Sequence, residues 1–427
     1  MITPWLSVVG IGEDGLAGLS PVGRSLLTQA AVVVGGTRHL AMLPSHSTQE
    51  QLLWQRPIHQ SIAEILQRRG EAVCVLASGD PLCYGIGATL LRHIPLAEMT
   101  LVPALSAFSL ACARLGWAYP EVETLSLCGR DPALLNAVLY PGAQILVLSS
   151  DRHTPAHVAQ QLTQQGYGNS QLTVLERMGG DHEQRFDGRA ATWKIPPGAD
   201  LNTLAIVCEF DDELPANTLE YASSSGYATG RSRLAGLPDD AYRHDGQITK
   251  CEVRAITLAA LAPLPGQLLW DVGAGCGSIS IEWLRSHARC RAIAIEPQGD
   301  RCQHIAYNAA TLGTPTLELI HGTAPEALVD LPQPHAIFIG GGLTVPGVLE
   351  TCWRSLLPGG RLVANAVTLE SEQRLFQAHQ ELGGTLTRIA IHRTAPIGKF
   401  LGWKALAPIT QWVVTQSRHP DEANRKM

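Results

Sequence analysis

A glycine-rich turn between a predicted strand and a predicted helix constrains the C-terminal half of the chain most strongly. The turn reads Asp271-Val-Gly-Ala-Gly-Cys-Gly-Ser278. An apolar run directly before it predicts a buried strand, and the periodic residues after it predict a helix. Gly273, Gly275 and Gly277 allow a tight turn and a close approach to a ligand. The pattern is typical of a βα unit that binds a nucleotide-like cofactor.

The next predicted strand, 291–295, ends in Glu296. A carboxylate one βαβ step downstream usually accepts hydrogen bonds from ribose hydroxyls. An acidic residue also stands two positions before the first glycine, which favours S-adenosylmethionine (SAM) over NAD(P), because a sulfonium cofactor carries no pyrophosphate. NAD(P) and a purely structural turn are the alternatives. The predicted cofactor contacts of this motif are Asp271, Gly273, Ala274, Gly275, Cys276, Gly277 and Glu296.

Length and composition set the broad class. A chain of 427 residues is longer than a domain with a single hydrophobic core usually is, so two or three domains are expected. An apolar content of 45% and a charged content of 16% suit a soluble α/β enzyme. No apolar run is long enough to cross a membrane, and the start of the chain lacks the pattern of a signal peptide, so we expect a cytoplasmic location.

Cysteine usage and charge exclude two further classes. The ten cysteines form no Cys-x-x-Cys pair and lie singly on apolar stretches, which predicts reduced, mostly buried thiols and no metal site. A net charge of −6 and a pI near 6.2 argue against a nucleic-acid partner, because such binding needs a basic face.

The first half alternates predicted strands with predicted helices, which indicates an α/β fold in two lobes of about 1–116 and 120–212. The predicted strands are 5–9, 31–34, 72–77, 99–102, 124–127, 145–148, 172–175 and 204–207. The predicted helices are 20–27, 106–115, 132–139 and 154–165. Ser20 followed by Pro21 is a typical N-cap and first helical position.

Several motifs of this half occur together in one family. They are Gly10-Ile-Gly12 with Gly15, Gly79-Asp80-Pro81 with Gly85, Pro103-Ala-Leu-Ser106, Glu176-Arg-Met-Gly179 and Asn202-Thr-Leu-Ala-Ile206. On these motifs, residues 1–212 resemble a tetrapyrrole methylase domain, a SAM-dependent fold of two lobes with a cleft between them. The resemblance implies cofactor contacts by Gly79, Asp80, Cys83, Ser106, Ala107, Met178 and Leu204. From the residues alone, Asp80 could be a turn residue, Ser106 a helix N-cap and Cys83 a core thiol.

Residues 213–245 are polar and rich in turn formers, which predicts a linker, and a domain over 246–417 follows. Thr249 and Glu252 have the spacing of a capping box at the start of a helix that runs to about residue 262. Further strands are predicted at 268–270, 317–320, 336–339, 362–364 and 411–414, and residues 418–427 are predicted to be a frayed tail.

A second resemblance covers this domain. Thr249-Lys-Cys-Glu-Val-Arg254, the glycine motif, Phe338-Ile-Gly-Gly-Gly342 and Asn365-Ala-Val-Thr368 resemble the decarboxylating precorrin methyltransferases, which have a class I, Rossmann-like, seven-stranded fold. The resemblance implies further cofactor contacts by Thr249, Thr323 and Ala324. It implies substrate contacts by Lys250, Arg254, Gly340, Gly341, Gly342, Asn365 and Lys399.

Together the halves are similar to a fused methyltransferase family of cobalamin biosynthesis. That resemblance implies SAM-dependent methylation of a precorrin at C5 and C15, with decarboxylation of the C12 acetate, by a homo-oligomer without a nucleic-acid or membrane partner. Ring carboxylates need cationic partners. The candidates are Arg243, Lys250, Arg254, Arg393 and Lys399. No catalytic acid or base is assigned.

Two other functions agree less well with the sequence. An RNA-modifying methyltransferase fusion is disfavoured by the acidic pI and by Asn365-Ala-Val-Thr368, which stands where an Asn-Pro-Pro-aromatic motif would lie. A non-enzymatic SAM sensor is disfavoured by the presence of two cofactor signatures.

Overall fold

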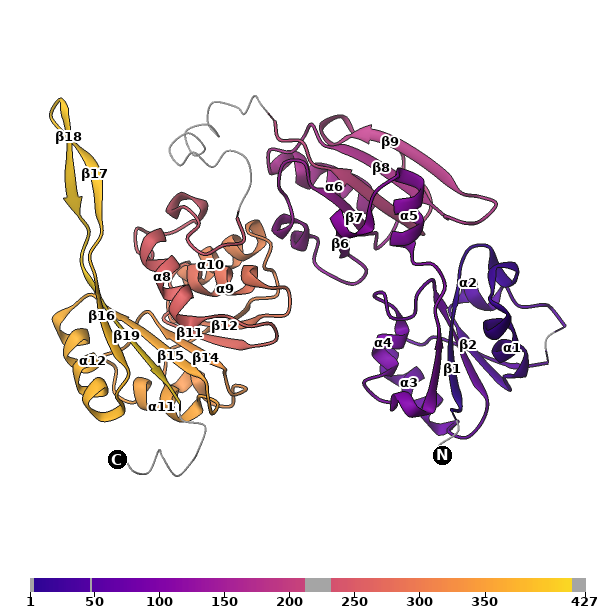
Figure 1. The fold of residues 1–427 in the computed structure, drawn as a ribbon, viewed down its shortest axis with the longest axis horizontal. Coiled ribbons are helices and arrows are strands. Elements are labelled where there is room, and N and C mark those ends of the chain that lie inside the picture. Colours follow the sequence, from indigo (N-terminus) through magenta and orange to yellow (C-terminus); the bar gives the residue numbers. More distant parts are fainter. Residues whose placement is uncertain (1–3, 47, 212–231, 417–427) are drawn as a thin grey trace. The chain divides into compact units, whose positions relative to one another are not determined.

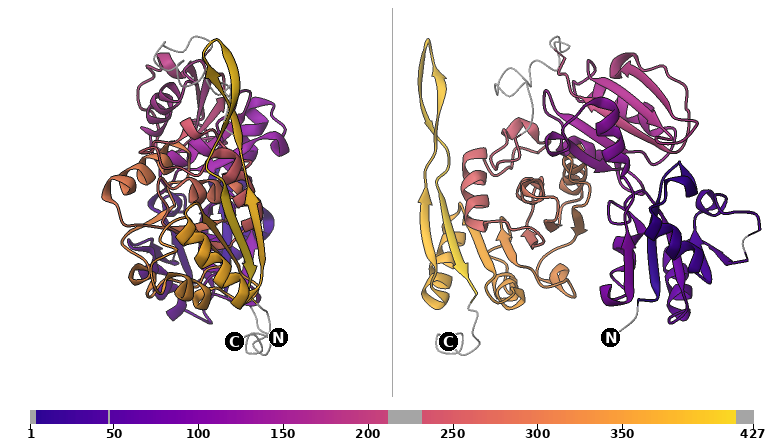
Figure 2. Two further views of the ribbon diagram at one scale, coloured as in Figure 1. Left: turned by 90° about the vertical axis from the view of Figure 1, so that its left-hand side faces the viewer. Right: turned by 45° about the vertical axis from the view of Figure 1, so that its right-hand side comes forward.

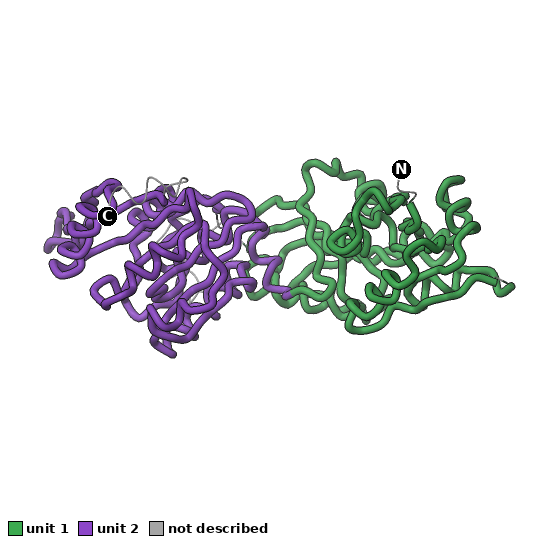
Figure 3. Tube along the Cα trace, turned by 90° about the horizontal axis from the view of Figure 1, so that it is seen from below, with its two compact units in different colours: residues 1–130, 140–213 green, residues 131–139, 214–427 purple. Residues whose placement is uncertain are grey.

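A computed structural model describes residues 4–46, 48–211 and 232–416 (Figure 1). The chain divides into two compact units, coloured separately in Figure 3. Unit 1 comprises residues 1–130 and 140–213, and unit 2 comprises residues 131–139 and 214–427. The predicted linker is thus described from residue 232 onward, and the predicted tail lies outside the described residues.

The first sheet of unit 1 is fully parallel, with the order β3-β2-β4-β1-β5. Its strands are β1 (Leu6–Ile11), β2 (Val32–Gly35), β3 (Glu50–Leu53), β4 (Val73–Ser78) and β5 (Met99–Val102). Its helices are α1 (Pro21–Gln29), α2 (Thr37–Leu40), α3 (Ile58–Gln67) and α4 (Ile86–Leu90), with 3-10 turns η1 (Gly15–Gly18) and η2 (Leu96–Glu98). The Ser20 side chain accepts a hydrogen bond from the Gly23 amide, so the predicted N-cap of α1 is confirmed.

The second sheet of unit 1 is mixed, with the order β6-β7-β10-β8-β9, and its parallel pair is β6 with β7. Its strands are β6 (Glu123–Ser126), β7 (Gln144–Leu148), β8 (Gln171–Glu176), β9 (Gln184–Arg189) and β10 (Asn202–Val207). The helices of this lobe are α5 (Ala107–Leu115), α6 (Thr154–Gln164), η3 (Tyr119–Glu121) and η5 (Ala190–Thr192). Helix α5 directly follows the first sheet in the chain and packs through Phe108 and Ala111 on the second. It therefore connects the lobe of the first sheet to the lobe of the second sheet.

The segment predicted as a helix over 132–139 behaves differently from the prediction. It forms a 3-10 helix, η4 (Pro132–Ala137), and residues 131–139 belong to unit 2. Its Leu135 side chain is fully buried, and the Asn136 side chain donates a 3.0 Å hydrogen bond to the carbonyl of Ala310 in α10 (Gly299–Thr311).

Unit 2 is built on a seven-stranded sheet of order β13-β12-β11-β14-β15-β19-β16. Its strands are β11 (Leu268–Val272), β12 (Arg291–Glu296), β13 (Glu318–His321), β14 (Ala336–Ile339), β15 (Arg361–Ala366), β16 (Thr385–Ile389) and β19 (Ile409–Thr415). The neighbours from β13 to β15 are parallel, and β19 runs antiparallel to β15 and β16. The predicted α/β class and class I sheet are confirmed.

Helices cover both faces of this sheet, so its central strands β11 and β14 are buried along their whole length. Leu268 and Trp270 enter the core on one face, and Leu269 between them enters the core on the other. The covering elements are α8 (Cys251–Leu261), α9 (Ser278–Ser286), α10, α11 (Val348–Ser355), α12 (Leu369–Leu382), η6 (Asp239–Ala241) and η7 (Glu326–Leu328).

The start of α8 differs from the predicted capping box. The helix begins at Cys251 with Lys250 as its N-cap, and no side chain caps it. The Glu252 carboxylate instead accepts 2.9 and 2.6 Å hydrogen bonds from Arg393, because the tertiary fold brings a cation within its reach.

A two-stranded hairpin that the sequence did not predict extends beyond the seven-stranded sheet (Figures 1 and 2). Its strands are β17 (His392–Ile397) and β18 (Phe400–Ala405), which pair antiparallel with each other. Ile397, Phe400, Leu401 and Trp403 are largely exposed on it.

Candidate cofactor and substrate pockets

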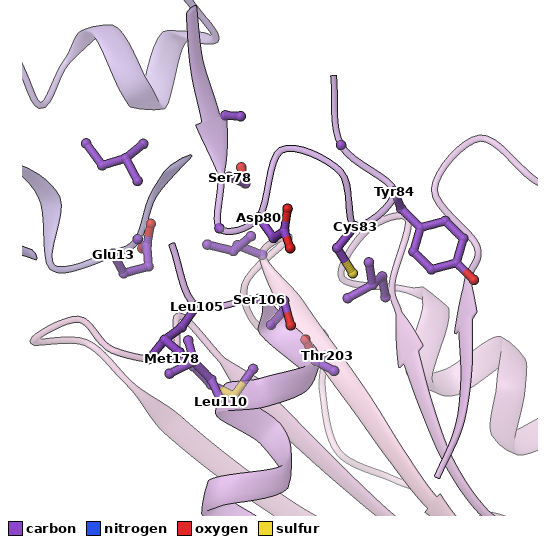
Figure 4. A pocket seen from close by; sticks show the side chains of 18 of the residues that line it. Glu13, Ser78, Asp80, Cys83, Tyr84, Leu105, Ser106, Leu110, Met178 and Thr203 are labelled. Atoms are coloured by element: carbon purple, nitrogen blue, oxygen red, sulfur yellow. The ribbon is translucent and has the colours of Figure 1, made fainter. Parts of the chain in front are cut away.

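Unit 1 contains a cavity of about 400 Å³ lined by loops of both its sheets. Figure 4 labels Asp80 and Cys83 in the loop after β4, Ser106 at the start of α5, Met178 in the turn after β8 and Thr203 on β10. The predicted residues that line this cavity are Gly79, Asp80, Cys83, Ser106, Ala107 and Met178. Leu204 is buried within β10 and does not line it, whereas its neighbour Thr203 does.

The predicted pocket residues also have local structural roles. Asp80 Oδ1 accepts a 2.8 Å hydrogen bond from the Leu82 amide, which closes a turn. Ser106 caps α5 by accepting a 3.1 Å bond from the Ser109 amide. Burial, and then the neighbouring Asp80, raises the pKa of the Cys83 thiol. These structural roles are compatible with a position at the cavity, and contact of these residues with a cofactor stays a prediction.

A polar cluster that sequence reasoning missed lies at the same cavity. Arg38 forms an ion pair with Glu13 and donates a 2.8 Å hydrogen bond to Ser78. Its Nη2 also lies 3.0 Å from Nε2 of buried His39. Burial, and then Arg38, lowers the pKa of His39 to about 4, so the imidazole is neutral at pH 7. The ends of the neighbouring parallel strands β1, β4 and β2 bring these residues together, and no sequence motif indicated the cluster.

The backbone at this cavity is strained at two non-glycine residues. Tyr84 has φ of +54° and Arg177 has φ of +47°, and both line the cavity. Left-handed conformations at bulky residues persist when surrounding contacts impose them, and they cluster at functional sites.

Unit 2 contains a second cavity, of about 560 Å³, at the carboxyl ends of its parallel strands. This edge is where open α/β sheets bind ligands. The predicted residues that line it are Thr249, Lys250, Gly273, Ala274, Gly275, Cys276, Glu296, Thr323, Ala324, Gly340, Gly341, Gly342 and Asn365.

The glycine loop after β11 packs closely against the loop after β14, and the contact requires a residue without a side chain at Gly273. Gly273 has φ of +71°, and a Cβ there would lie 2.7 Å from the Gly341 amide nitrogen. Glu296 accepts a 2.8 Å hydrogen bond from the Gly275 amide and a 3.0 Å bond from the Gln298 amide. The carboxylate thus fixes the loop while it faces the cavity, and its remaining lone pairs suit ribose hydroxyls.

Two residues of the glycine motif do not line the cavity. Asp271 is fully buried, and its Oδ2 accepts bonds of 3.1 and 2.6 Å from the amide and hydroxyl of Ser280. Burial raises the pKa of Asp271 to about 6. Gly277 lies beneath the loop, against Ile305 of α10. The predicted cofactor contacts at Asp271 and Gly277 are therefore corrected to support of the strand-to-helix turn.

Arg254, predicted to bind substrate, is corrected in the same way. Its side chain is 0% exposed, and its Nε donates a 2.6 Å hydrogen bond to Glu282. Glu282 also accepts bonds from the amides of Gly236 and Leu237 and from the Tyr242 hydroxyl. This cluster links the segment 236–242 to helices α8 and α9. The guanidinium group of Arg254 is used within it and is not available to a ligand.

The other predicted cations fall in three places. Arg393 is paired with Glu252 and Asp239, and Arg243 stacks 4.0 Å from the centre of the Tyr307 ring. Lys399 lies at the turn of the exposed hairpin, outside the cavity lining. Lys250 lines the cavity, as does the unpredicted Arg301, which Asp245 and Gln247 hold at 2.8 Å each.

Within 4–46, 48–211 and 232–416, no group of three or more His, Cys, Asp or Glu residues could hold a metal ion. No helix in these ranges is long and apolar enough to cross a membrane.

Two α/β units, each with a cavity lined by residues predicted to bind SAM, fit a fusion of two methyltransferase domains. Residues 6–193 match the family model of tetrapyrrole (corrin/porphyrin) methylases, and residues 240–416 match that of the precorrin methyltransferase domain. A Sinorhizobium protein named precorrin-6Y C(5,15)-methyltransferase [decarboxylating] is 46% identical over 97% of this chain and 97% of its own. The chain belongs to this family of decarboxylating methyltransferases, as the resemblance predicted.

Two shorter relatives carry single activities in their names. A Salmonella typhimurium cobalt-precorrin-7 C(5)-methyltransferase is 28% identical over 42% of this chain and 88% of its own. A Pyrobaculum calidifontis protein, named "Probable cobalt-precorrin-6B C(15)-methyltransferase (decarboxylating)", is 34% identical over 41% of this chain and 92% of its own.

Proposed function

We propose that this enzyme methylates precorrin-6Y at C5 in unit 1 and at C15 in unit 2, and removes the C12 acetate carboxyl, giving precorrin-8X in cobalamin biosynthesis. The observation that carries the proposal is the presence of one cavity in each unit, lined by that unit's own predicted cofactor residues. The names of the relatives support it. The alternative of an RNA-modifying fusion has no such support.

In this proposal the residues of each cavity mainly bind and orient. Bound SAM supplies an electrophilic methyl group, and the tetrapyrrole supplies an electron-rich carbon that must be held about 3 Å from it. In unit 2, Glu296 binds the ribose and the glycine loop receives the nucleoside. In unit 1, Leu105, Leu110 and Met178 present apolar surface that excludes water from the transfer.

Cationic residues hold the ring carboxylates, because charge-assisted hydrogen bonds to carboxylates are strong. Lys250 and Arg301 line the unit 2 cavity, and Arg38 and Arg177 line that of unit 1. The absence of a paired acid near Lys250 among the described residues leaves its ammonium available to a ligand.

Two further parts of the proposal concern the whole enzyme. We place it in the cytoplasm, where its ten free cysteines would stay reduced. We also propose a homo-oligomer in which the β17–β18 hairpin packs on a second copy. A two-stranded sheet is marginally stable alone, and its open edges and exposed Phe400, Leu401 and Trp403 need a partner.

The function is tested by supplying SAM and precorrin-6Y to the full chain. Calorimetry should give two SAM sites per chain, and the product should carry two new methyl groups and lack one carboxyl. A single SAM site, or a product with one methyl group, would contradict the division between the units.

A further inference from the structure

A buried hydrogen-bond triad stands behind the Asn365 side chain at the unit 2 cavity. Asn365 Nδ2 donates a 3.0 Å bond to Thr257 Oγ1 in α8. Gln411 Nε2, from β19, donates 3.1 Å to the same Thr257 Oγ1 and 3.0 Å to Asn365 Oδ1. Thr257 and Gln411 are almost fully buried, whereas Asn365 lines the cavity.

The polarity of this triad fixes the direction of the Asn365 amide. Thr257 Oγ1 lies 2.8 Å from the carbonyl of Val253, which can only accept, so the hydroxyl proton goes there. Thr257 Oγ1 must then accept from Asn365, and Asn365 must turn its NH₂ group toward it. Gln411 Nε2 donates one of its protons to Thr257 Oγ1 and the other to Asn365 Oδ1, so both of its donors are used within the triad. The second proton of Asn365 Nδ2 has no partner among the described residues, so Asn365 offers the cavity a neutral donor.

On the cavity side, the lining residues next to Asn365 along β15 and in the segment that leads into β19 are apolar. Val367 lies two residues further along the chain, and Ile409 starts the strand that pairs with β15. Leu406 and Ala407, which precede Ile409, line the cavity as well. A carboxylate bound beside Asn365 would therefore have one neutral hydrogen bond and no charged partner from these neighbours.

We infer that Asn365 marks the subsite that receives the acetate carboxylate lost in decarboxylation, with Thr257 and Gln411 as its positioning residues. The inference rests on the proposed function. A cation would stabilise the carboxylate in the ground state and oppose its loss. A neutral donor in an apolar wall orients the group without that penalty. The carbon–carbon bond then breaks, its electron pair enters the conjugated macrocycle, carbon dioxide leaves, and the methylene carbon takes a proton from water.

The test measures carbon dioxide released per methyl group transferred to C15 by the full chain with SAM and precorrin-6Y. Asn365→Asp removes the donor and adds a like charge, so the ratio should fall about tenfold or more. Thr257→Val frees the amide to turn and should lower the ratio about threefold, whereas Thr257→Ser keeps the hydroxyl and should restore it. Thr387→Val, an exposed change on β16 opposite Gln411, is the matched control and should leave the ratio unchanged.

The outcomes separate the inference from the proposed function. If the unmodified enzyme does not methylate C15, the proposed function itself fails. If it does, and Asn365→Asp still releases carbon dioxide at the unmodified ratio, the subsite lies elsewhere. A parallel fall of both steps in Thr257→Val with an unchanged ratio would also overturn the inference, because a merely structural role gives that result.

Discussion

Asp271 is a buried carboxylate at the start of the glycine loop, and its ionisation makes the stability of unit 2 depend on pH. Its Oδ1 has no hydrogen-bond partner among the described residues, and Ser280 alone supplies both bonds to Oδ2. Burial outweighs these bonds and raises the pKa to about 6 from a usual 3.8. Between about pH 4 and pH 6, Asp271 is therefore protonated in the folded state and ionised in the unfolded state.

That proton gives the first prediction. Stability contributed by protonated Asp271 is fully present below about pH 4 and is lost as the pH rises through 6. Asp271→Asn cannot ionise, so the stability of the unmodified protein relative to this variant should decline by about 3 kcal/mol across that window. Urea unfolding of unit 2 at pH 4, 5, 6 and 7 measures it. A difference that stays constant across these pH values would contradict the pKa shift.

Arg254 gives a second prediction at the residue scale. Arg254→Met keeps the volume of the side chain and leaves Glu282 buried without its cation, which should cost about 3–5 kcal/mol. Adding Glu282→Gln removes the stranded charge and should recover part of that loss, measured by urea unfolding. Equal losses in the single and double variants would show that packing of the guanidinium, and not charge, is what unit 2 needs.

At the scale of elements, η4 depends on the absence of a side chain at Gly313. A Cβ at Gly313 would lie 2.2 Å from the Ala137 amide nitrogen. Gly313→Ala should therefore lower the free energy of unfolding of unit 2, and by at least about 1 kcal/mol more than the strain of a left-handed alanine alone would. Gly266→Ala is the control, because it has φ of +90° and open space around it. Equal losses of unit 2 stability in the two variants would mean that η4 moves aside without cost.

The hairpin gives a second prediction at this scale. Phe400 and Trp403 are 79% and 74% exposed, and replacing both with Ser removes the apolar surface proposed to join two copies. Sedimentation should show the double variant as a smaller species than the unmodified enzyme. Leu369→Ser, at an 80% exposed position on α12, is the control and should not change the assembly. An unmodified chain that sediments as a monomer would refute the proposed role.

For the whole molecule, the two cavities should work independently, since each is lined by residues of one unit. Gly275→Val places a branched side chain where the loop faces the unit 2 cavity, and should remove one of two SAM sites in calorimetry while C5 methylation continues. Asp80→Ala should do the reverse and spare C15 methylation with decarboxylation. Loss of both reactions in either variant would show that the units are coupled.

The sequence alone determined the two α/β halves, and most of the residues that it predicted as cofactor contacts line one of the two cavities. Strands such as 268–270, caps such as Ser20 and the turn around Gly273 follow from local periodicity and backbone conformation, which depend on neighbours in the chain. The motifs behind the family resemblance could also be recognised from the sequence, because the residues of a loop at a strand end are contiguous in the chain.

Only the tertiary structure decided what the isolated charges and segments do. Arg254 and Lys250 are four residues apart and equally cationic, yet one is buried against Glu282 and the other faces the cavity. The difference lies in partners distant in sequence, and residues 131–139 join unit 2 for the same reason. Burial and long-range pairing fix the role of a charged side chain, and no local pattern contains them.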